Sequence, residues 1–276
     1  MTFDPMQPYG EVLETTVRVA SWNVWSRFGP WEEREPVLVA ALSDLDADIV
    51  CFQEAWSVDD DTQTDRFIAK LNLEHGVQFG EHEYLGIASG QAVLSRWPIS
   101  ESTSLKIDAV DKDGSGGGAT FARIAGPRGP IDVVSLILEW RPDLSHVRSD
   151  QLTEILQWAK ELSDPWHPLF ICGDFNATPD SDELRALVGL GPVHVPEMVF
   201  YDAITMRASG DTTTWSERNP FAKIGLYPEK QLDHIFSHWP KAHGAGHPVA
   251  ASIIGSDPVD GIFASDHFGV TAELRY

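Results

Sequence analysis

The chain has 276 residues, of which 42% are hydrophobic and 22% are charged, a composition that excludes an intrinsically disordered or membrane-embedded protein. Asp and Glu total 42 against 20 Lys and Arg, which gives a formal net charge of -22. Nonspecific nucleic-acid binding depends on basic patches that displace counterions, so this charge disfavours nucleic acid as a partner and favours a small-molecule substrate. The alternative is an acidic surface that only keeps the protein in solution.

The N-terminal segment and the cysteines predict where the protein works. Residues 1–14 are polar and lack the basic start and apolar run of a secretion signal, and no stretch approaches the roughly 20 apolar residues of a membrane span. Cys51 and Cys172 each lie in an apolar run, which predicts buried, reduced thiols. We therefore expect a cytoplasmic protein without a membrane span, and the oligomeric state stays open.

Hydrophobic periodicity predicts a series of strands and helices. Pro36 suits the first turn of the first helix, and Ser145 can cap the longest one. In chain order, we predict a strand at 17–22, a helix around 36–45, a strand at 48–52, a helix at 65–73, a hairpin of strands 121–125 and 131–138, a helix from Ser145, a strand at 169–172, a short helix that begins at 180–183, and strands at 232–236 and 269–274.

Two stretches lack such a pattern. Residues 108–118 are rich in glycine, and we expect a flexible surface loop there. Residues 189–230 are expected to be irregular and to bring Trp215 near a functional site. Because we find no internal repeat and no long linker, we predict one domain over residues 1–276, with an N-terminal extension at 1–15.

Side chains that can bind metal or phosphate gather where the predicted strands end or begin. They are Asn23, Glu54, Asp174, Asn176, Asp266 and His267. Each of them alone could be a turn residue, a helix cap or a solvated charge. Together, polar groups at strand ends above an apolar sheet are a usual arrangement of an active site.

Six ordered blocks carry a resemblance to a known family. The blocks read SWNV, DADIVCFQE, AVLSRWPI, ICGDFNATP, QLDHIF and SDHFGV, and they extend over residues 17–274. In this combination the chain resembles the endonuclease/exonuclease/phosphatase superfamily. The resemblance implies an α/β fold: a four-layer sandwich of two packed mixed β-sheets flanked by helices.

The resemblance also implies a metal site. Phosphoester hydrolysis needs charge neutralisation at the phosphoryl oxygens, and a hard cation such as Mg²⁺ (or Mn²⁺) prefers oxygen ligands. We expect Glu54 to be the principal ligand, with Asn23 beside it and Asp266 nearby or acting through water. Whether one or two metal ions take part is not readable from the sequence.

The remaining family positions imply the catalytic groups. The residue that matches Asp174 orients and deprotonates the attacking water, and the residue that matches Asn176 holds a phosphoryl oxygen or the nucleophile. His267 is expected to contact the scissile group, while Asp233 fixes its tautomer and raises its basicity.

One position departs from the family pattern. Many members carry a second histidine where this chain has Ile137, which can neither donate a proton nor bind phosphate. General acid–base help is worth roughly 10²- to 10⁴-fold in rate, so the loss needs an explanation. Either His146 or His234 substitutes, or the leaving group needs no acid, or the site performs different chemistry.

Tryptophans lie close to the motif residues, and Trp25 and Trp140 are expected to line a substrate pocket together with Ile137. We therefore predict a divalent-metal-dependent hydrolase, a phosphodiesterase or phosphatase, for a small-molecule or lipid-type substrate. The alternative is a metalloenzyme of the same fold that acts on an ester, a lactone or an activated carbonyl. A catalytically silent binding module ranks last, because the predicted metal ligands are intact.

Overall fold

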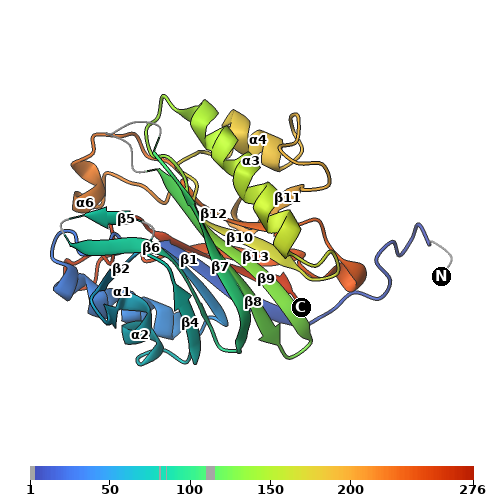
Figure 1. The fold of residues 1–276 in the computed structure, drawn as a ribbon, viewed down its shortest axis with the longest axis horizontal. Helices are drawn as coiled ribbons and strands as arrows, with labels where there is room; N and C mark the ends of the chain where they lie inside the picture. The colour runs from blue at the N-terminus through green and yellow to red at the C-terminus, as the bar shows by residue number, and fades with distance from the viewer. Residues whose placement is uncertain (1–3, 81, 85, 110–115) are drawn as a thin grey trace.

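The computed structural model describes residues 4–80, 82–84, 86–109 and 116–276. Its described strands form two mixed sheets (Figure 1). In the first sheet the strand order is β13-β14-β1-β2-β6-β4, with β3 beside β2 and β5 beside β6, and β1 runs parallel to β2. Its strands are β1 (Thr16–Asn23), β2 (Ile49–Val58), β3 (Asp61–Thr62), β4 (His75–Gln78), β5 (His82–Tyr84), β6 (Ile87–Ser95), β13 (Pro248–Ile254) and β14 (Gly269–Arg275).

The second sheet has the order β11-β12-β10-β9-β8-β7, in which β10 runs parallel to β9 and the other pairs are antiparallel. The predicted hairpin is confirmed as the pair β8 and β9. The strands of this sheet are β7 (Ile99–Ile107), β8 (Gly117–Gly126), β9 (Gly129–Ile137), β10 (Leu169–Asp174), β11 (Phe200–Asp202) and β12 (Asp233–His238).

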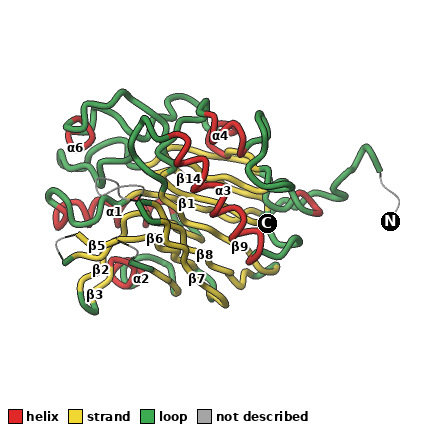
Figure 2. Tube along the Cα trace, turned by 45° about the horizontal axis from the view of Figure 1, so that its top comes forward, coloured by secondary structure: helices red, strands yellow, loops and turns green. Residues whose placement is uncertain are grey.

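Helices cover the outer face of each sheet (Figures 1 and 2). Side chains of α1 (Trp31–Leu45) and α2 (Gln63–Ile68) pack on the first sheet, and those of α3 (Ser145–Leu162) and α4 (Asp182–Leu187) pack on the second. A third apolar cluster fills the space between the sheets. The predicted four-layer α/β sandwich is thus confirmed. The short helices are α5 (Ala203–Arg207), α6 (Pro220–Lys223) and the 3-10 turn η1 (Ala242–Gly244).

The core between the sheets also contains the two cysteines, which are free and buried as predicted. Burial, together with the neighbouring Cys51, raises the pKa of the Cys172 thiol well above its usual value. Polar contacts cross the same interface: Gln53 Nε2 donates to Ser135 Oγ at 3.0 Å, and Ser135 Oγ donates to the carbonyl of Phe52 at 2.9 Å. No helix in the described part of the chain is long and apolar enough to span a bilayer.

Helix ends are where the sequence prediction fails most. Helix α1 begins at Trp31, so Pro36 lies inside it rather than in its first turn. Helix α2 ends at Ile68, short of residue 73. Ser145 does not cap α3; its hydroxyl donates to Glu183 at 2.7 Å, so a tertiary contact replaces the local one.

The strands that were not predicted lie mainly in polar or short segments. β7 carries few apolar residues because it is an edge strand of the second sheet, and β13 is the edge strand of the first. The predicted loop at 108–118 falls partly on residues 110–115, which lie outside the described residues, while Gly117 and Gly118 belong to β8.

Candidate active site

A cavity of about 380 Å³ lies at one end of the interface between the sheets. Both sheets contribute to it: Glu54 comes from β2 of the first sheet and Asp174 from β10 of the second. Asp266 and His267, directly before β14, also line it. The structure therefore brings together four of the predicted site residues from distant parts of the chain.

Strained backbone positions orient these side chains. Glu54 has φ 55° and lies in an irregularity of the pairing between β2 and β6, where the register shifts between Phe52 and Ala55. Asn176, two residues after Asp174 on the chain, has φ 49°. A Cβ at Gly173 would come within 2.1 Å of a backbone oxygen of β9, so only glycine fits there. Such conformations persist where the surrounding structure holds them, and they cluster at functional sites.

Asn23 connects the two sheets at the cavity. Its Nδ2 donates to Glu54 Oε1 at 2.9 Å and to Asp174 Oδ2 at 3.1 Å, while its Oδ1 accepts from the backbone N–H of Trp25 at 3.0 Å. The side-chain oxygen that would ligate a cation is thus turned to the backbone. In this arrangement Asn23 holds the two carboxylates in position, and its expected role as a metal ligand stays a prediction.

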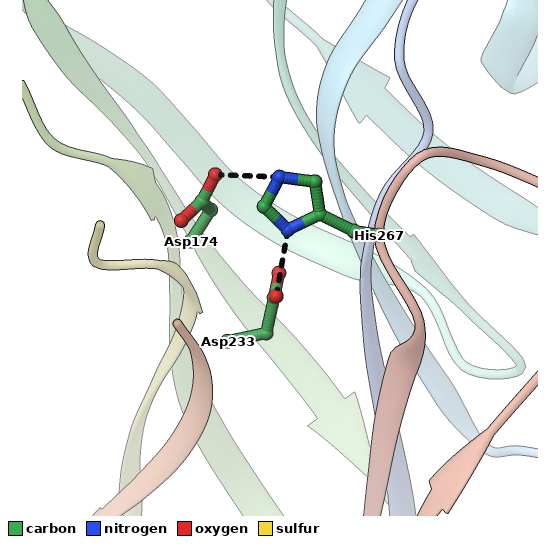
Figure 3. Close-up of side chains that lie close together, drawn as sticks. All are labelled: Asp174, Asp233 and His267. Carbon is green, nitrogen blue, oxygen red and sulfur yellow. Dashed lines mark hydrogen bonds and ion pairs between the residues drawn. The ribbon is translucent and has the colours of Figure 1, made fainter. Parts of the chain in front are cut away.

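His267 lies between two carboxylates (Figure 3). Its Nδ1 is 2.8 Å from Asp233 Oδ2, and its Nε2 is 3.6 Å from Asp174 Oδ2. Burial alone would lower the pKa of His267, but Asp233 and Asp174 raise it well above its usual value. The edge of the Trp215 ring packs against the imidazole, with 4.9 Å between the ring centroids. This arrangement favours an imidazolium that donates a hydrogen bond to Asp233 and forms an ion pair with Asp174.

Three acidic groups face the same cavity: Asp174 and Asp266 are buried and Glu54 is half-buried. Burial raises the pKa of Glu54, and it raises the pKa of Asp174 and of Asp266 to about 6 each. The charges of His267 and Arg34 oppose this shift at Glu54 and Asp266, but these two cations do not balance the four carboxylates that result when Asp233 is included. An excess of buried negative charge built from oxygen donors fits a hard divalent cation.

A second group of three side chains also lies close enough to share an ion. One atom each of Asp174, Asp233 and His267 lies within 4.8 Å of the others. Nδ1 of His267, however, is hydrogen-bonded to Asp233, and both ring nitrogens face carboxylates. This geometry suits the movement of a proton better than the binding of a metal.

Two residues that the sequence did not single out as site residues brace the site. Arg34 is buried and donates five hydrogen bonds to backbone carbonyls, four in residues 24–28 and one at Ala264. Asn219 donates to the carbonyls of Ser265 and Asp266 at 2.7 and 3.1 Å. Because their partners are main-chain carbonyls, which every residue type offers, no sequence motif marks these residues.

The predicted pocket residues divide into two groups. Trp25, Trp140 and Ile137 line the cavity, as does Trp215 from the irregular stretch. Neither of the two candidate substitute histidines is among the described residues that line it. His146 is exposed at the start of α3, where its side chain faces solvent.

His234 is fully buried beneath the site rather than in it. Its Nδ1 is 3.0 Å from Asp202 Oδ2, and its Nε2 is 3.1 Å from the carbonyl of Ala177, on the loop that follows Asn176. Burial lowers the pKa of His234, but Asp202 outweighs this effect and raises it. His234 therefore contacts the loop after Asn176 and is not among the described residues that line the cavity, and its expected role as a substitute histidine stays a prediction.

Residues 20–267 match the sequence model of the Endonuclease/Exonuclease/phosphatase family. The chain belongs to this family. The prediction of the family is confirmed, and membership supports a divalent-metal-dependent hydrolase of phosphoester bonds in general terms. No curated protein sequence matches the chain.

Solved structures share the fold at low sequence identity. A structure of TDP2 from C. elegans superimposes with a TM-score of 0.73 at 19% identity, covering 97% of this chain and 78% of that one. The structure of D. rerio TDP2 complexed with a single-strand DNA product has a TM-score of 0.74 at 19% identity, covering 95% of this chain and 100% of that one. An endonuclease/exonuclease/phosphatase family protein from Bacteroides thetaiotaomicron has a TM-score of 0.72 at 20% identity, covering 94% of this chain and 97% of that one. These likenesses support the fold and leave the substrate open.

Proposed function

We propose that this protein hydrolyses a phosphoester bond in a small-molecule or lipid-type substrate, with a bound Mg²⁺ or Mn²⁺ ion. One observation carries the proposal: Asn23 joins the carboxylates of Glu54 and Asp174 at the cavity into which His267 also faces. This set combines oxygen ligands for a cation, a carboxylate base and an imidazolium within one enclosed volume.

We assign the metal ion to Glu54 and Asp266, because the positively charged side chains around them do not balance the negative charge of the site. Asn23 keeps Glu54 in place through its amide nitrogen. A divalent cation supplies charge neutralisation for phosphoryl oxygens when it is bound. Both ligands lie in the cavity between the sheets, where they are less exposed to water than at the surface and interact more strongly with a charged substrate.

Asp174 is assigned as the base that accepts a proton from the attacking water. Its pKa of about 6 leaves it ionised at neutral pH yet basic enough to accept a proton. Its Oδ1 accepts from the N–H of Asn176 at 2.9 Å, which fixes the carboxylate plane. Of the two hydrogens on Nδ2 of Asn176, one donates to the carbonyl of Leu138, and we assign the other to a phosphoryl oxygen.

His267 is assigned to a phosphoryl oxygen as a positively charged donor. Asp233 holds its Nδ1, so the ring cannot rotate away, and the resulting imidazolium stabilises negative charge that develops on the phosphoryl group. The carboxylate of Asp233 thus acts through His267 and does not itself contact substrate.

The cavity lining supports a compact, partly apolar substrate. Aromatic side chains supply much of it, and among the described lining residues Lys230 is the one lysine or arginine. A formal charge of -22 also opposes the approach of a long polyanion. The TDP2 structure with a DNA product belongs to a different protein, so an oligonucleotide is an arm of the test rather than the expected substrate. The aromatic lining comprises Trp25, Phe28, Trp140, Trp215 and Tyr227.

The test is turnover of a substrate panel with and without Mg²⁺ or Mn²⁺. The panel contains aryl and alkyl phosphodiesters, the matching monoesters, a single-stranded oligonucleotide, an aryl carboxylic ester and a lactone. We expect metal-dependent release from a phosphoester, loss of that turnover in Glu54→Ala, and a decrease of roughly 10²- to 10⁴-fold in Asp174→Ala. Asp44→Ala, which alters an exposed carboxylate on α1, is the matched control.

Each other outcome has a definite meaning. Turnover of the carboxylic ester or lactone without any phosphoester would favour the second candidate, a metalloenzyme for non-phosphate substrates, which Ile137 in the cavity wall favours. Oligonucleotide cleavage as the fastest reaction would contradict the small-substrate proposal. A normal rate in Glu54→Ala would contradict the assignment of the metal site.

A further inference from the structure

On β9, the strand position that pairs with the proposed base carries no proton donor. Ile137 ends β9, and its Cα is in register with Asp174 on β10 and with Gly118 on β8. In-register residues on neighbouring strands project to the same face, and Ile137 and Asp174 both line the cavity. An alcohol leaving group therefore needs its proton from another side chain.

A second feature of the same cavity is the side chain of His82. It belongs to β5 of the first sheet, lines the cavity, and its ring is hydrogen-bonded to the backbone of Gly117, the neighbour of Gly118. Its Nε2 is buried and has no hydrogen-bond partner among the described residues. A buried polar atom left without a partner costs about 1–3 kcal/mol, so this nitrogen is suited to an atom of a ligand.

We propose that His82 is the general acid that protonates the leaving oxygen of the substrate, a role that Ile137 cannot fill. This inference rests on the proposed function. Asp174, Ile137 and Gly118 lie on three successive strands, so the backbone edge that His82 contacts is two strand spacings from the backbone of Asp174, roughly 9 to 10 Å. Asp174 and His82 thus line the same cavity from separate positions, which leaves room for a substrate between them.

The step balances as a single displacement. The water oxygen forms a bond to phosphorus while the bond from phosphorus to the leaving oxygen breaks, and that oxygen keeps the electron pair. The proton of the water passes to Asp174, and the proton on Nε2 of the His82 imidazolium passes to the leaving oxygen. Neutral His82 and protonated Asp174 then exchange protons with solvent after the products depart.

The surroundings of His82 lower its pKa, which makes its imidazolium a stronger acid than a free one. Burial lowers this pKa most, and the charge of Lys106 lowers it further. The hydrogen bond to the Gly117 backbone and the charge of Asp108 act in the opposite direction. Because the donor must be protonated, turnover of a substrate with an alcohol leaving group declines as the pH rises through this lowered pKa. A nitrophenolate is a far weaker base than an alkoxide and departs without a proton, so its release lacks this dependence.

The experiment compares two phosphodiesters that differ only in an alkyl or a nitrophenyl leaving group, with Mg²⁺ present. His82→Gln keeps polar character but cannot act as an acid. We expect it to lower kcat/KM for the alkyl substrate by roughly 10²-fold or more and to change the nitrophenyl substrate little. His75→Gln is the matched control, because His75 lies on β4 and is not among the described residues that line the cavity.

The other outcomes are informative as well. An equal decrease for both substrates assigns His82 to binding or folding and overturns the proposal. An unchanged rate on the alkyl substrate also overturns it. If His82→Gln does not fold, the wild-type pH profiles decide: a decline towards high pH for the alkyl substrate alone supports the acid role, and identical profiles overturn it. Absence of turnover of both substrates by the wild type contradicts the proposed function itself.

Discussion

Replacing Asp266 by asparagine should stabilise the metal-free protein. Burial, with the charge of Glu54, raises the pKa of Asp266 from its usual 3.8 to about 6. A folded-state pKa above the unfolded one means that folding is favoured at low pH and penalised as the pH rises through about 6. At 1.36 kcal/mol per pKa unit, ionised Asp266 costs the folded state about 3 kcal/mol at pH 8, and Asp266→Asn removes this cost.

The assay is urea unfolding followed by tryptophan fluorescence in a chelator, at pH 5 and pH 8. For wild type, this one carboxylate should lower the free energy of unfolding by about 1.4 kcal/mol between the two pH values, because much of the penalty already exists at pH 5. In Asp266→Asn this part of the decrease should vanish, and at pH 8 the variant should exceed wild type by up to about 3 kcal/mol. Added Mg²⁺ should stabilise wild type more than the variant, since the variant lacks a proposed ligand.

The control is Asp44→Asn, an exposed carboxylate on α1 whose replacement should change stability by less than about 0.5 kcal/mol. A less stable Asp266→Asn variant in chelator at pH 8 would refute the argument that ionised carboxylates at the cavity strain the metal-free fold. Equal stabilisation of wild type and variant by Mg²⁺ would remove Asp266 from the metal site.

Two further predictions concern the protons of the site. Asp233→Asn should lower the pKa of His267, measured by NMR titration, because it removes the largest of the carboxylate contributions that raise this pKa, and kcat should fall by roughly 10²-fold; an unchanged pKa would contradict the role of Asp233. Ile137→His should raise kcat/KM on an alkyl phosphodiester by far less than about 10²-fold, because His82 already supplies the proton; a gain of that size would mean that the wild-type site lacks an acid.

Much of the site could be predicted because its residues follow apolar strands. The ends of β1 and β10 and the irregular point of β2 meet at one edge of the sandwich, so motif residues such as Asn23, Glu54 and Asp174 converge without any knowledge of the coordinates. The role of Asn23 could not be predicted. Which atom of its amide faces the carboxylates depends on the backbone N–H of Trp25, a contact that only the folded chain defines.

The supporting residues escaped prediction for a related reason. Arg34 and Asn219 bind main-chain carbonyls up to 230 residues away, and any residue type offers a carbonyl. His82 lies in a short strand with no clear periodicity, and its importance follows from its neighbour on another sheet. His146 and His234 were considered instead because they lie near motif residues in sequence, which does not determine the face on which a side chain projects.

The bond from Asn23 to Asp174 and the bond from His267 to Asp233 each join one sheet to the other. Neither sheet alone contains all the proposed site residues. A chain whose two sheets have formed but have not packed together is therefore expected to lack the proposed activity. We therefore expect metal-dependent turnover to appear only after the two sheets have packed together, so that its appearance during refolding would time this step.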